Sequence, residues 1–238
     1  MGFFDFLDDL PQYRDRSGTA KRMNNRHRFL IEDFAAEIDG ARVLDLGAHD
    51  GRWAYAFAAA GAAEIVAVEA RATLIAEFAV FPDAALRERV SWRVGDVFDQ
   101  LQTAVAAGEN YDVIAIFGLL YHVMDHHRLL ALVRQLSPRL VLIDSEFVQR
   151  PKPVVVLTRE KTDNPLNAAE QYPGQQRALV GTPSRSALEW MAEGLDFHLV
   201  WSDWDRLPEV ERRGVADYFR DAGQGRLRAT CALRPRAE

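Results

Sequence analysis

The sequence predicts an α/β fold: a doubly wound, mostly parallel seven-stranded sheet with an antiparallel edge strand, helices on both faces and an N-terminal helical lid. Two observations support this prediction. Short aliphatic and β-branched runs alternate with amphipathic or alanine-rich runs between residues 43 and 143, and repeated β-α units of this length form parallel sheets. The run at 113–117 is almost wholly apolar, as expected for a strand buried on both faces.

The expected elements follow one another without an internal repeat, so we expect a single domain over residues 1–238. Residues 1–40 are predicted to form the helical lid, residues 41–146 a cofactor-binding half, and residues 147–238 a substrate cover with the closing strands. The proline-rich segment 147–182 is expected to be irregular, with one short strand at 154–157. Strands are expected at 43–46, 65–68, 90–94, 113–117, 140–143, 197–201 and 227–233, and helices at 52–60, 73–80, 101–107, 128–136, 184–193 and 209–220.

The composition narrows the class of partner. The chain carries 29 Lys and Arg against 35 Asp and Glu, a formal net charge of -6. An acidic surface repels phosphate backbones, which disfavours nucleic acid as the main partner, although a local basic patch would still permit it. No apolar run approaches the roughly 18 residues of a membrane span, so no membrane partner is expected. The single cysteine, Cys231, fits a reducing cytoplasm, where we expect the protein to act.

The run from Val43 to Gly51, Val-Leu-Asp-Leu-Gly-Ala-His-Asp-Gly, predicts a strand that turns into a helix beside a ligand. Gly47 permits the sharp turn, and Gly51 lets the helix start close to the ligand. Asp45 is placed to hold the loop or an ammonium group of the ligand, and Asp50 supplies a carboxylate at the helix start. Ligands of open α/β sheets bind at the carboxyl ends of the strands. The loop residues expected to contact a cofactor are therefore Asp45, Gly47, Ala48, His49, Asp50 and Gly51.

Acidic and glycine residues also follow the next three strands. Glu69 closes the second strand, where a carboxylate can accept hydrogen bonds from both hydroxyls of a ribose. After the third strand, Asp96 can accept a hydrogen bond from an adenine amino group, and Val97 or Phe98 can cover the ring. Gly118 follows the fourth strand and permits close approach of the cofactor. The cofactor contacts expected on these strands are Glu69, Ala70, Gly95, Asp96, Val97, Phe98, Phe117, Gly118 and Leu119.

The spacing of the glycine loop discriminates between cofactors. Dinucleotide-binding loops usually read Gly-x-Gly-x-x-Gly, with the pyrophosphate at the helix N-terminus, whereas this loop reads Gly-Ala-His-Asp-Gly and is flanked by acids. Acids near a pyrophosphate are unfavourable, and acids near a sulfonium-bearing amino acid are favourable. With all four motifs in order, the chain resembles the class I, Rossmann-like S-adenosylmethionine-dependent methyltransferases. The resemblance implies that the cofactor is S-adenosylmethionine rather than NAD.

The stretch from Phe117 to Val123, Phe-Gly-Leu-Leu-Tyr-His-Val, is similar to a methyltransferase subgroup that includes the tRNA wobble-uridine carboxymethyltransferase and many small-molecule relatives. His122 lies at the expected mouth of the cofactor cleft, and an imidazole suits a general base near neutral pH. We predict that His122 is the general base and that Tyr121 orients the cofactor or the substrate. The alternative is that His122 caps a helix or packs beneath the cofactor.

Candidate substrate contacts are spread over the chain: Tyr13, Arg26, Trp53, Glu146 and Tyr172. Glu146 can bind an amine or a hydroxyl, or it can be a solvated loop acid, and the residue type of Trp53 favours packing in the core or at its rim over a substrate contact. Tyr13 would suit a mobile lid that closes over the substrate. A basic stretch could steer an anionic substrate such as a carboxylate, a phosphate or RNA, or it could be a solvated helix face. It consists of Arg14, Arg16, Lys21, Arg22, Arg26 and Arg28.

Three functions stay open at this point. The leading hypothesis is a methyltransferase that acts on an oxygen or nitrogen of a small-molecule acceptor. The second is an RNA-modifying methyltransferase, favoured by the subgroup resemblance and disfavoured by the acidic charge. The third is a non-catalytic protein that binds S-adenosylmethionine and keeps only the fold. The sequence has no Cys/His cluster with zinc spacing, so no metal is expected, and the apolar Phe3, Phe4 and Phe6 would suit a homodimer contact.

Overall fold

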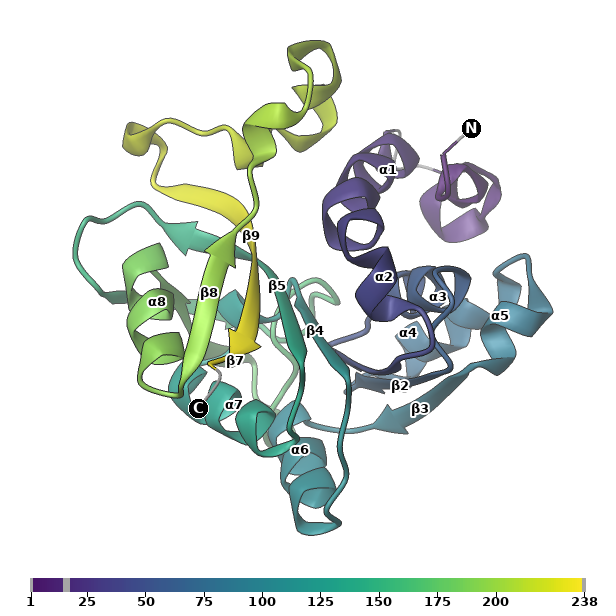
Figure 1. Ribbon diagram of the computed structural model, residues 1–238, viewed down its shortest axis with the longest axis horizontal. Helices are drawn as coiled ribbons and strands as arrows, with labels where there is room; N and C mark the ends of the chain where they lie inside the picture. The colour runs from purple at the N-terminus through teal and green to yellow at the C-terminus, as the bar shows by residue number, and fades with distance from the viewer. Residues whose placement is uncertain (1, 15–17, 237–238) are drawn as a thin grey trace.

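The computed structural model describes residues 2–14 and 18–236, and a seven-stranded sheet forms its centre (Figure 1). The strands are β1 (Arg42–Leu46), β2 (Glu64–Glu69), β3 (Val90–Val94), β4 (Val113–Phe117), β5 (Leu140–Val148), β8 (Phe197–Trp201) and β9 (Arg226–Pro235). They are ordered β3-β2-β1-β4-β5-β9-β8. Strands β1 to β5 pair in parallel, and β9 pairs antiparallel with β5 and β8. The predicted mostly parallel seven-stranded sheet is confirmed, and its antiparallel strand lies one position in from the edge.

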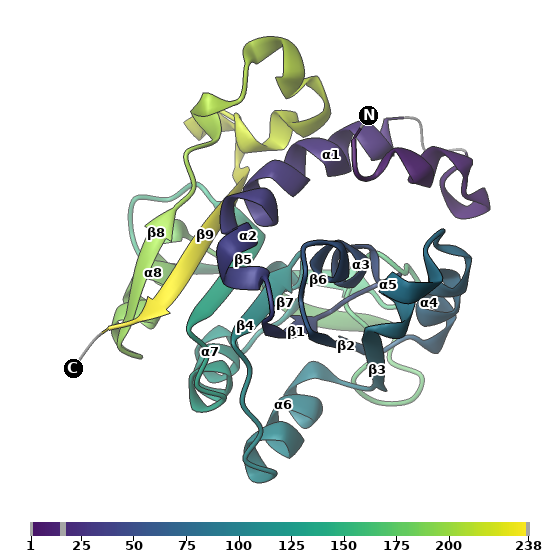
Figure 2. The ribbon, with the colours of Figure 1, turned by 45° about the vertical axis from the view of Figure 1, so that its right-hand side comes forward.

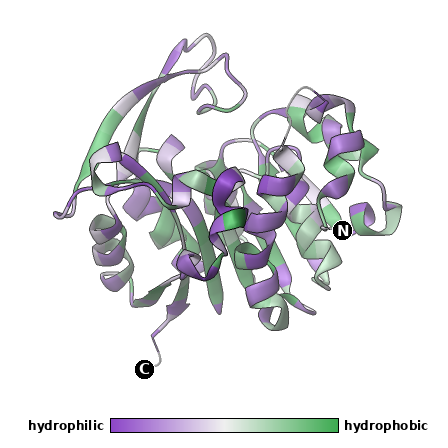
Figure 3. Cartoon of the chain, turned by 90° about the horizontal axis from the view of Figure 1, so that it is seen from above, coloured by the Kyte–Doolittle hydropathy of each residue, from purple (hydrophilic) through white to green (hydrophobic). Residues whose placement is uncertain are grey.

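Each face of the sheet carries its own core and its own helices. On one face lie α1 (Thr19–Leu30), α2 (Ala35–Ile38), α3 (Arg52–Ala59) and α5 (Ala84–Glu88), and on the other lie α6 (Val97–Ala106), α7 (His126–Gln135) and α8 (Arg185–Glu193). Ile65 and Ala67 of β2 pack into the first core, whereas Val66 and Val68 pack into the second. This alternation is what a strand buried on both faces requires. Figure 3 shows the central strands in green between the helical layers.

The segment between β5 and α8 is more regular than expected. Strand β6 (Val155–Lys161) pairs antiparallel with β7 (Arg177–Pro183) in a separate two-stranded sheet. The predicted irregular cover is therefore limited mainly to residues 162–176, which we call the cover segment. Strand β5 continues to Val148 instead of ending at residue 143, because it pairs with β9 as far as Val148.

Helix boundaries also differ from the expectation where side chains cap them. Helix α6 begins at Val97, four residues earlier than predicted, because the Asp96 carboxylate accepts a hydrogen bond from the N–H of Phe98. Helix α5 was not expected, and Asp83 caps it in the same way. The short α4 (Ala72–Ala76) continues as a 3₁₀ turn to Val80, and the helix expected at 209–220 is the 3₁₀ segment Glu209–Tyr218.

The described part of the N-terminal segment is helical and lies on the α3 face, where α1 runs above α2 and α3 (Figure 2). The rings of Phe3 and Phe6 contact Tyr55, the ring of Phe4 contacts Trp53, and Phe4 is fully buried. Phe4 is therefore not available to a second subunit, whereas Phe3 and Phe6 are partly exposed, and the expected homodimer contact stays a prediction. Arg16 lies outside the described residues. Within the described ranges, no helix is both long enough and apolar enough to cross a membrane.

Candidate cofactor and acceptor site

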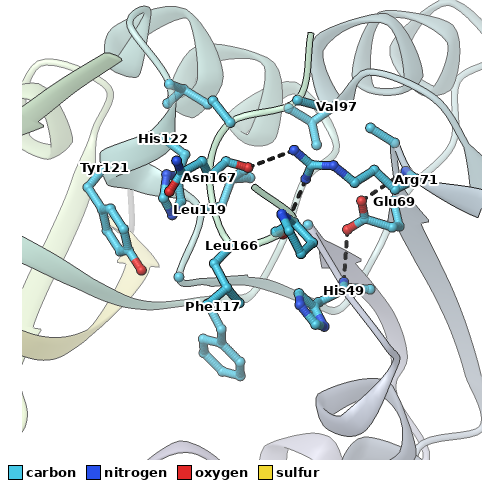
Figure 4. A pocket seen from close by; sticks show the side chains of 18 of the residues that line it. His49, Glu69, Arg71, Val97, Phe117, Leu119, Tyr121, His122, Leu166 and Asn167 are labelled. Carbon is cyan, nitrogen blue, oxygen red and sulfur yellow. Dashed lines mark hydrogen bonds between the residues drawn. The ribbon is translucent and has the colours of Figure 1, made fainter. Parts of the chain in front are cut away.

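A cavity of about 340 Å³ lies at the carboxyl ends of the parallel strands (Figure 4). Its lining comes from the turns after β1, β2, β3 and β4, and also from α1, the cover segment and β9. Open α/β sheets place ligands at this edge. Of the predicted cofactor contacts, the residues that line the cavity are Gly47, Ala48, His49, Glu69, Ala70, Asp96, Val97, Phe98, Phe117, Gly118 and Leu119.

The glycine loop turns tightly because its backbone adopts left-handed conformations. Gly47 has a φ of 72° and His49 a φ of 56°, a region that glycine tolerates and other residues enter at a cost. The N–H groups of Gly47 and Ala48 both donate to the carbonyl of Val68, at 3.0 and 2.9 Å. The loop is thus fixed against β2, and the side chain of His49 is held at the cavity wall.

Glu69 ties the ends of β1 and β2 together and faces the cavity. Its Oε2 accepts from the N–H of His49 and its Oε1 from the N–H of Arg71, both at 3.0 Å (Figure 4). A carboxylate oxygen can accept more than one hydrogen bond, so both oxygens keep capacity for the hydroxyls of a ribose. Glu69 is 6% exposed and lines the cavity.

The residues present fit S-adenosylmethionine. Nε2 of His49 is buried without a hydrogen-bond partner among the described residues, although His49 lines the cavity. Such an orphaned polar atom costs free energy until a ligand or water pairs with it. Glu69 would hold the ribose, Asp96 and Phe98 the adenine, and Gly47 and Gly118 would permit close approach of the amino-acid end.

Four predicted cofactor contacts lie next to the cavity without lining it. Asp50 is buried, accepts from the Tyr13 hydroxyl, and pairs with Arg52 at 2.7 Å. A Cβ on Gly51 would lie 2.6 Å from the Phe78 ring, so close packing requires a glycine at this position. The other two are Gly95, whose N–H donates to the Glu69 carbonyl at 3.0 Å, and Asp45, which is 1% exposed.

Asp45 is chemically unusual because its carboxyl is buried and incompletely paired. Its Oδ2 has no hydrogen-bond partner among the described residues. Burial, followed by the negative charge of Glu69, raises the pKa of Asp45 to about 7. By contrast, burial acts to raise the pKa of Asp50, but the Arg52 guanidinium and the His49 side chain together outweigh it and hold that pKa well below its usual range. The two acids of one loop therefore have different charge states near neutral pH.

Tyr121 and His122 lie together on the 3₁₀ turn Leu120–His122, directly after β4, and both line the cavity. Nδ1 of His122 lies 2.7 Å from Oε2 of Glu160 on β6. Burial raises the pKa of Glu160, but the hydrogen bonds from His122 and from the Ala168 N–H outweigh burial and lower it below its ordinary value. A carboxylate at Nδ1 fixes the orientation of the ring and favours a proton on Nδ1.

Arginines that are anchored by a buried carboxylate lie beside Tyr121, and the Arg228 guanidinium lies 5.7 Å from the centre of the Tyr121 ring. Asp144, at 0% exposure, accepts from Nη2 of Arg26 and Nε of Arg228, both at 2.7 Å. The hydroxyls of Tyr218 and Thr230 donate to its other oxygen at 2.6 and 2.8 Å. Although burial raises the pKa of Asp144, the charges of Arg228 and Arg26 outweigh it and lower the pKa to about 2.

The cover segment closes the cavity over the cofactor end. The Arg71 guanidinium donates to the carbonyls of Asn167 at 2.9 Å and of Pro165 at 3.4 Å (Figure 4). On the other side, the N–H of Ala168 donates to Oε2 of Glu160 at 2.8 Å. Arg71 and Glu160 therefore fasten the same short segment from two directions.

The predicted substrate contacts separate into two groups. Arg26 and Trp53 line the cavity, and the Arg26 guanidinium lies 5.0 Å from the centre of the Trp53 ring. Tyr13 is buried against Asp50, because the N-terminal turns fold over α3. Glu146 lies within β5 and pairs with Arg226 at 3.2 Å, instead of in a loop. Tyr172 is 61% exposed on the cover segment.

Several lining or supporting residues were not identified from the sequence. Arg22 was named only as part of the basic stretch. The only indication for Asp144 was its position directly after a predicted strand. Nothing near Glu160 or Arg228 in the sequence indicates a site, because each reaches the cavity through a hairpin or a closing strand. The additional lining residues are Arg22, Arg52, Arg71, Val123, Pro165, Leu166, Asn167, Ala168, Ala169, Gln171 and Arg228. Over residues 2–14 and 18–236, no three His, Cys, Asp or Glu side chains are grouped to hold a metal ion.

Comparison with known proteins agrees with this geometry. The family model described as a methyltransferase domain matches residues 19–201. No curated protein sequence matches the chain. The N-terminal domain of EvdMO1 with S-adenosylhomocysteine (SAH) bound has a TM-score of 0.62 at 19% identity, over 91% of this chain and 81% of that one.

Two further solved structures share the fold. The DhpI–SAH complex has a TM-score of 0.60 at 16% identity, over 98% of this chain and 94% of that one. The [4+2]-cyclase SpnF has a TM-score of 0.54 at 16% identity, over 92% and 82%. The family match spans the glycine loop, Glu69, the β4 end and the cover segment. The chain therefore belongs to the methyltransferase-domain family and is an S-adenosylmethionine-dependent methyltransferase.

Proposed function

We propose that this enzyme methylates an oxygen or nitrogen of a small-molecule acceptor, with His122 as general base. The observation that carries the proposal is the His122–Glu160 pair, 2.7 Å apart, at the cavity wall beside the end of β4. Glu160 engages Nδ1, which leaves Nε2 to accept a proton. S-adenosylmethionine supplies a methyl group on a sulfonium, which needs no activation by the protein beyond alignment and exclusion of water.

A base is required only where the acceptor atom loses a proton, as a hydroxyl or an ammonium does. His122 would take that proton while Glu160 holds the ring in place, and Tyr121 would orient the acceptor. Trp53 and Phe117 give the same end of the cavity apolar walls. The alternative role, in which His122 only packs beneath the cofactor, leaves the carboxylate partner at Nδ1 without a purpose.

The partly covered cavity favours a small molecule over RNA. The cover segment lies over the cavity and is held there by hydrogen bonds with Arg71 and Glu160. The formal net charge of -6 also disfavours binding of a phosphate backbone. The buried free thiol of Cys231 fits a reducing compartment, so we place the enzyme in the cytoplasm.

The test begins with stabilisation by SAH, measured as a shift in the unfolding temperature. Labelled S-adenosylmethionine is then incubated with pools of small hydroxyl and amine compounds or with RNA. We expect label in the small-molecule pool, and label in RNA alone would contradict the proposal. His122→Ala should lower kcat by about 10²- to 10⁴-fold with little change in SAH affinity. His127→Ala, an exposed neighbour on α7, is the matched control, and unchanged turnover in His122→Ala would contradict the base role.

A further inference from the structure

Three arginines meet at the end of the cavity that lies away from Glu69. Arg22 and Arg26 come from α1 and Arg228 from β9, and all three line the cavity. Asp144 pairs with Arg26 and Arg228, and Asp217 pairs with Arg22 through two bonds of 2.7 Å. Three guanidinium groups thus face two carboxylates, which leaves one positive charge without a partner in this cluster.

The carboxylates of the cluster stand behind the arginines, while the cavity wall itself presents cations. Asp144 and Asp217 do not line the cavity. The described carboxylates that do line it are Glu69 and Asp96, which follow β2 and β3. Those strands lie on the other side of β1 from β9. The ribose end therefore carries both signs, because Arg52 and Arg71 line the cavity together with Glu69 and Asp96, whereas the arginine end presents guanidinium groups and no described carboxylate.

The arginine cluster is directed at the point where methyl transfer is expected. A Cβ on Gly118, directly after β4, would lie 3.5 Å from Nη2 of Arg228 and 3.8 Å from the Tyr121 hydroxyl. Strand β9 is three positions from β1 in the sheet, which is roughly 14 Å at the usual strand spacing. The guanidinium of Arg228 thus reaches from β9 to the end of β4, beside Gly118 and Tyr121.

Both inner arginines are held rigidly. Arg26 and Arg228 are 6% and 7% exposed and share the one carboxylate of Asp144. A buried cation that lacks a full counter-charge is destabilising unless a ligand supplies it. The planar guanidinium offers parallel donors that match a carboxylate or phosphate in a bidentate manner. Anchoring by Asp144 fixes the orientation of both groups before a ligand arrives, which reduces the entropy cost of binding.

We propose that Arg22, Arg26 and Arg228 form an anion subsite, and that the methyl acceptor carries a carboxylate or phosphate group which this subsite holds. The inference rests on the proposed function, because it names the chemistry of the acceptor for the same cavity. Trp53, whose ring centre lies 5.0 Å from the Arg26 guanidinium, and Phe117 line the cavity and would pack against the apolar body of such an acceptor. The same oxyanion chemistry has a second source, the carboxylate of the cofactor's own amino-acid end, so the experiment separates the two.

The first arm measures binding by calorimetry to the protein saturated with SAH. Benzoate and phenyl phosphate are compared with benzamide, a neutral compound of similar shape. We expect at least one of the anions to bind about tenfold or more tightly than benzamide. Arg228→Gln and Arg22→Gln should each remove this preference. Arg226→Gln should retain it, because Arg226 lies on the same strand and pairs with Glu146 outside the cavity. Equal binding of benzamide and both anions by the wild type would overturn the proposal.

The second arm compares SAH with methylthioadenosine, which lacks the amino-acid carboxylate. We expect Arg228→Gln to change the affinity for both by less than about twofold. A tenfold loss for SAH alone would show that the arginines hold the cofactor, and it would overturn the proposal. If Arg228→Gln does not fold, Arg22→Gln takes its place as the test variant, because the Arg22 side chain is 28% exposed and its replacement should be tolerated. An anion preference in Arg22→Gln equal to that of the wild type would then overturn the proposed subsite. Failure of the wild type to bind SAH at all would instead contradict the proposed function, whatever the anions do.

Discussion

The two ends of the cavity are built in different ways. At the cofactor end, the lining follows β1, β2 and β3 directly, and the key bonds join neighbouring turns, such as Glu69 to the N–H groups of His49 and Arg71. At the acceptor end, the bonds connect distant segments. Arg26 and Asp144 are 118 residues apart, Arg228 and Asp144 are 84 apart, and His122 and Glu160 are 38 apart.

The two ends of the cavity therefore depend on the rest of the fold to different degrees. The cofactor end needs only a strand, a tight turn and an acid, so it can form wherever the parallel sheet forms. The acceptor end exists only when α1, the β6–β7 hairpin and β9 have all docked on the sheet. Its side chains therefore contribute to global stability as well as to recognition, and substitutions there should change both properties together.

The largest effect is expected from Asp144→Ala. This substitution leaves two buried guanidinium groups without their carboxylate and removes an acceptor from the Tyr218 and Thr230 hydroxyls. Breaking one side of a buried ion cluster costs about 3–5 kcal/mol. We expect a loss of that order in the free energy of unfolding, measured by urea denaturation at pH 7.

The matched control for Asp144 is Glu146→Ala on the same strand. Glu146 pairs with Arg226 at 3.2 Å, and both side chains are partly exposed, at 24% and 34%. Exposed pairs of this kind contribute less than about 1 kcal/mol. Similar losses in the two variants would show that the acceptor end is not coupled to the fold in the way proposed.

The second effect is a pH dependence at the cofactor end. Burial and the charge of Glu69 raise the pKa of Asp45 from 3.8 to about 7 in the folded protein. The folded state therefore binds more protons than the unfolded state between these values. The stability contributed by the protonated carboxyl is fully present below 3.8 and is lost as the pH rises to about 7.

Asp45→Asn removes this titration while keeping the shape of the side chain. Unfolding in urea across that pH window should show a flatter dependence in the variant than in the wild type, with a difference on the order of a few kcal/mol. Asp96→Asn, at an exposed helix cap, serves as the control and should keep the slope of the wild type. Identical slopes for Asp45→Asn and the wild type would show that Asp45 is not protonated near neutral pH.

The same difference explains what could be predicted from the sequence. The glycine loop, Glu69 and Gly118 could be predicted because each directly follows a strand that hydrophobic pattern identifies. Glu160 and Arg228 could not, because their proximity to His122 and Asp144 depends on hairpin formation and on the register of β5 with β9. In that register Arg228 lies opposite Glu146, yet its guanidinium bonds to Asp144, two residues earlier on β5. The sequence pattern does not predict this diagonal contact.

The third effect concerns Glu69. Glu69→Ala removes two acceptors from the N–H groups of His49 and Arg71 and the carboxylate that we expect to hold the ribose. Hydrogen bonds to a charged group are worth about 1.5–3 kcal/mol, so SAH affinity measured by calorimetry should fall about tenfold or more. Glu88→Ala, an exposed acid on α5, should bind SAH as the wild type does. If Glu69→Ala binds SAH normally, the ribose lies elsewhere.

The smallest effect is expected at the junction between the two ends, where Arg71 holds the cover segment. Arg71→Met removes donors to the carbonyls of Asn167 and Pro165 but leaves the bond from Ala168 to Glu160. The bond from the Asn167 side chain to the Lys161 carbonyl also remains, so the loss of Arg71 should loosen the segment without unfolding it, at a cost of about 1 kcal/mol. Amide hydrogen exchange should therefore quicken at residues 164–169, and SAH affinity should fall by a few-fold. Arg159→Met, an exposed change on β6, should alter neither. Unchanged exchange in Arg71→Met would show that the bonds to Glu160 and to the Lys161 carbonyl fix the segment without Arg71, so that β6 at the acceptor end alone holds it.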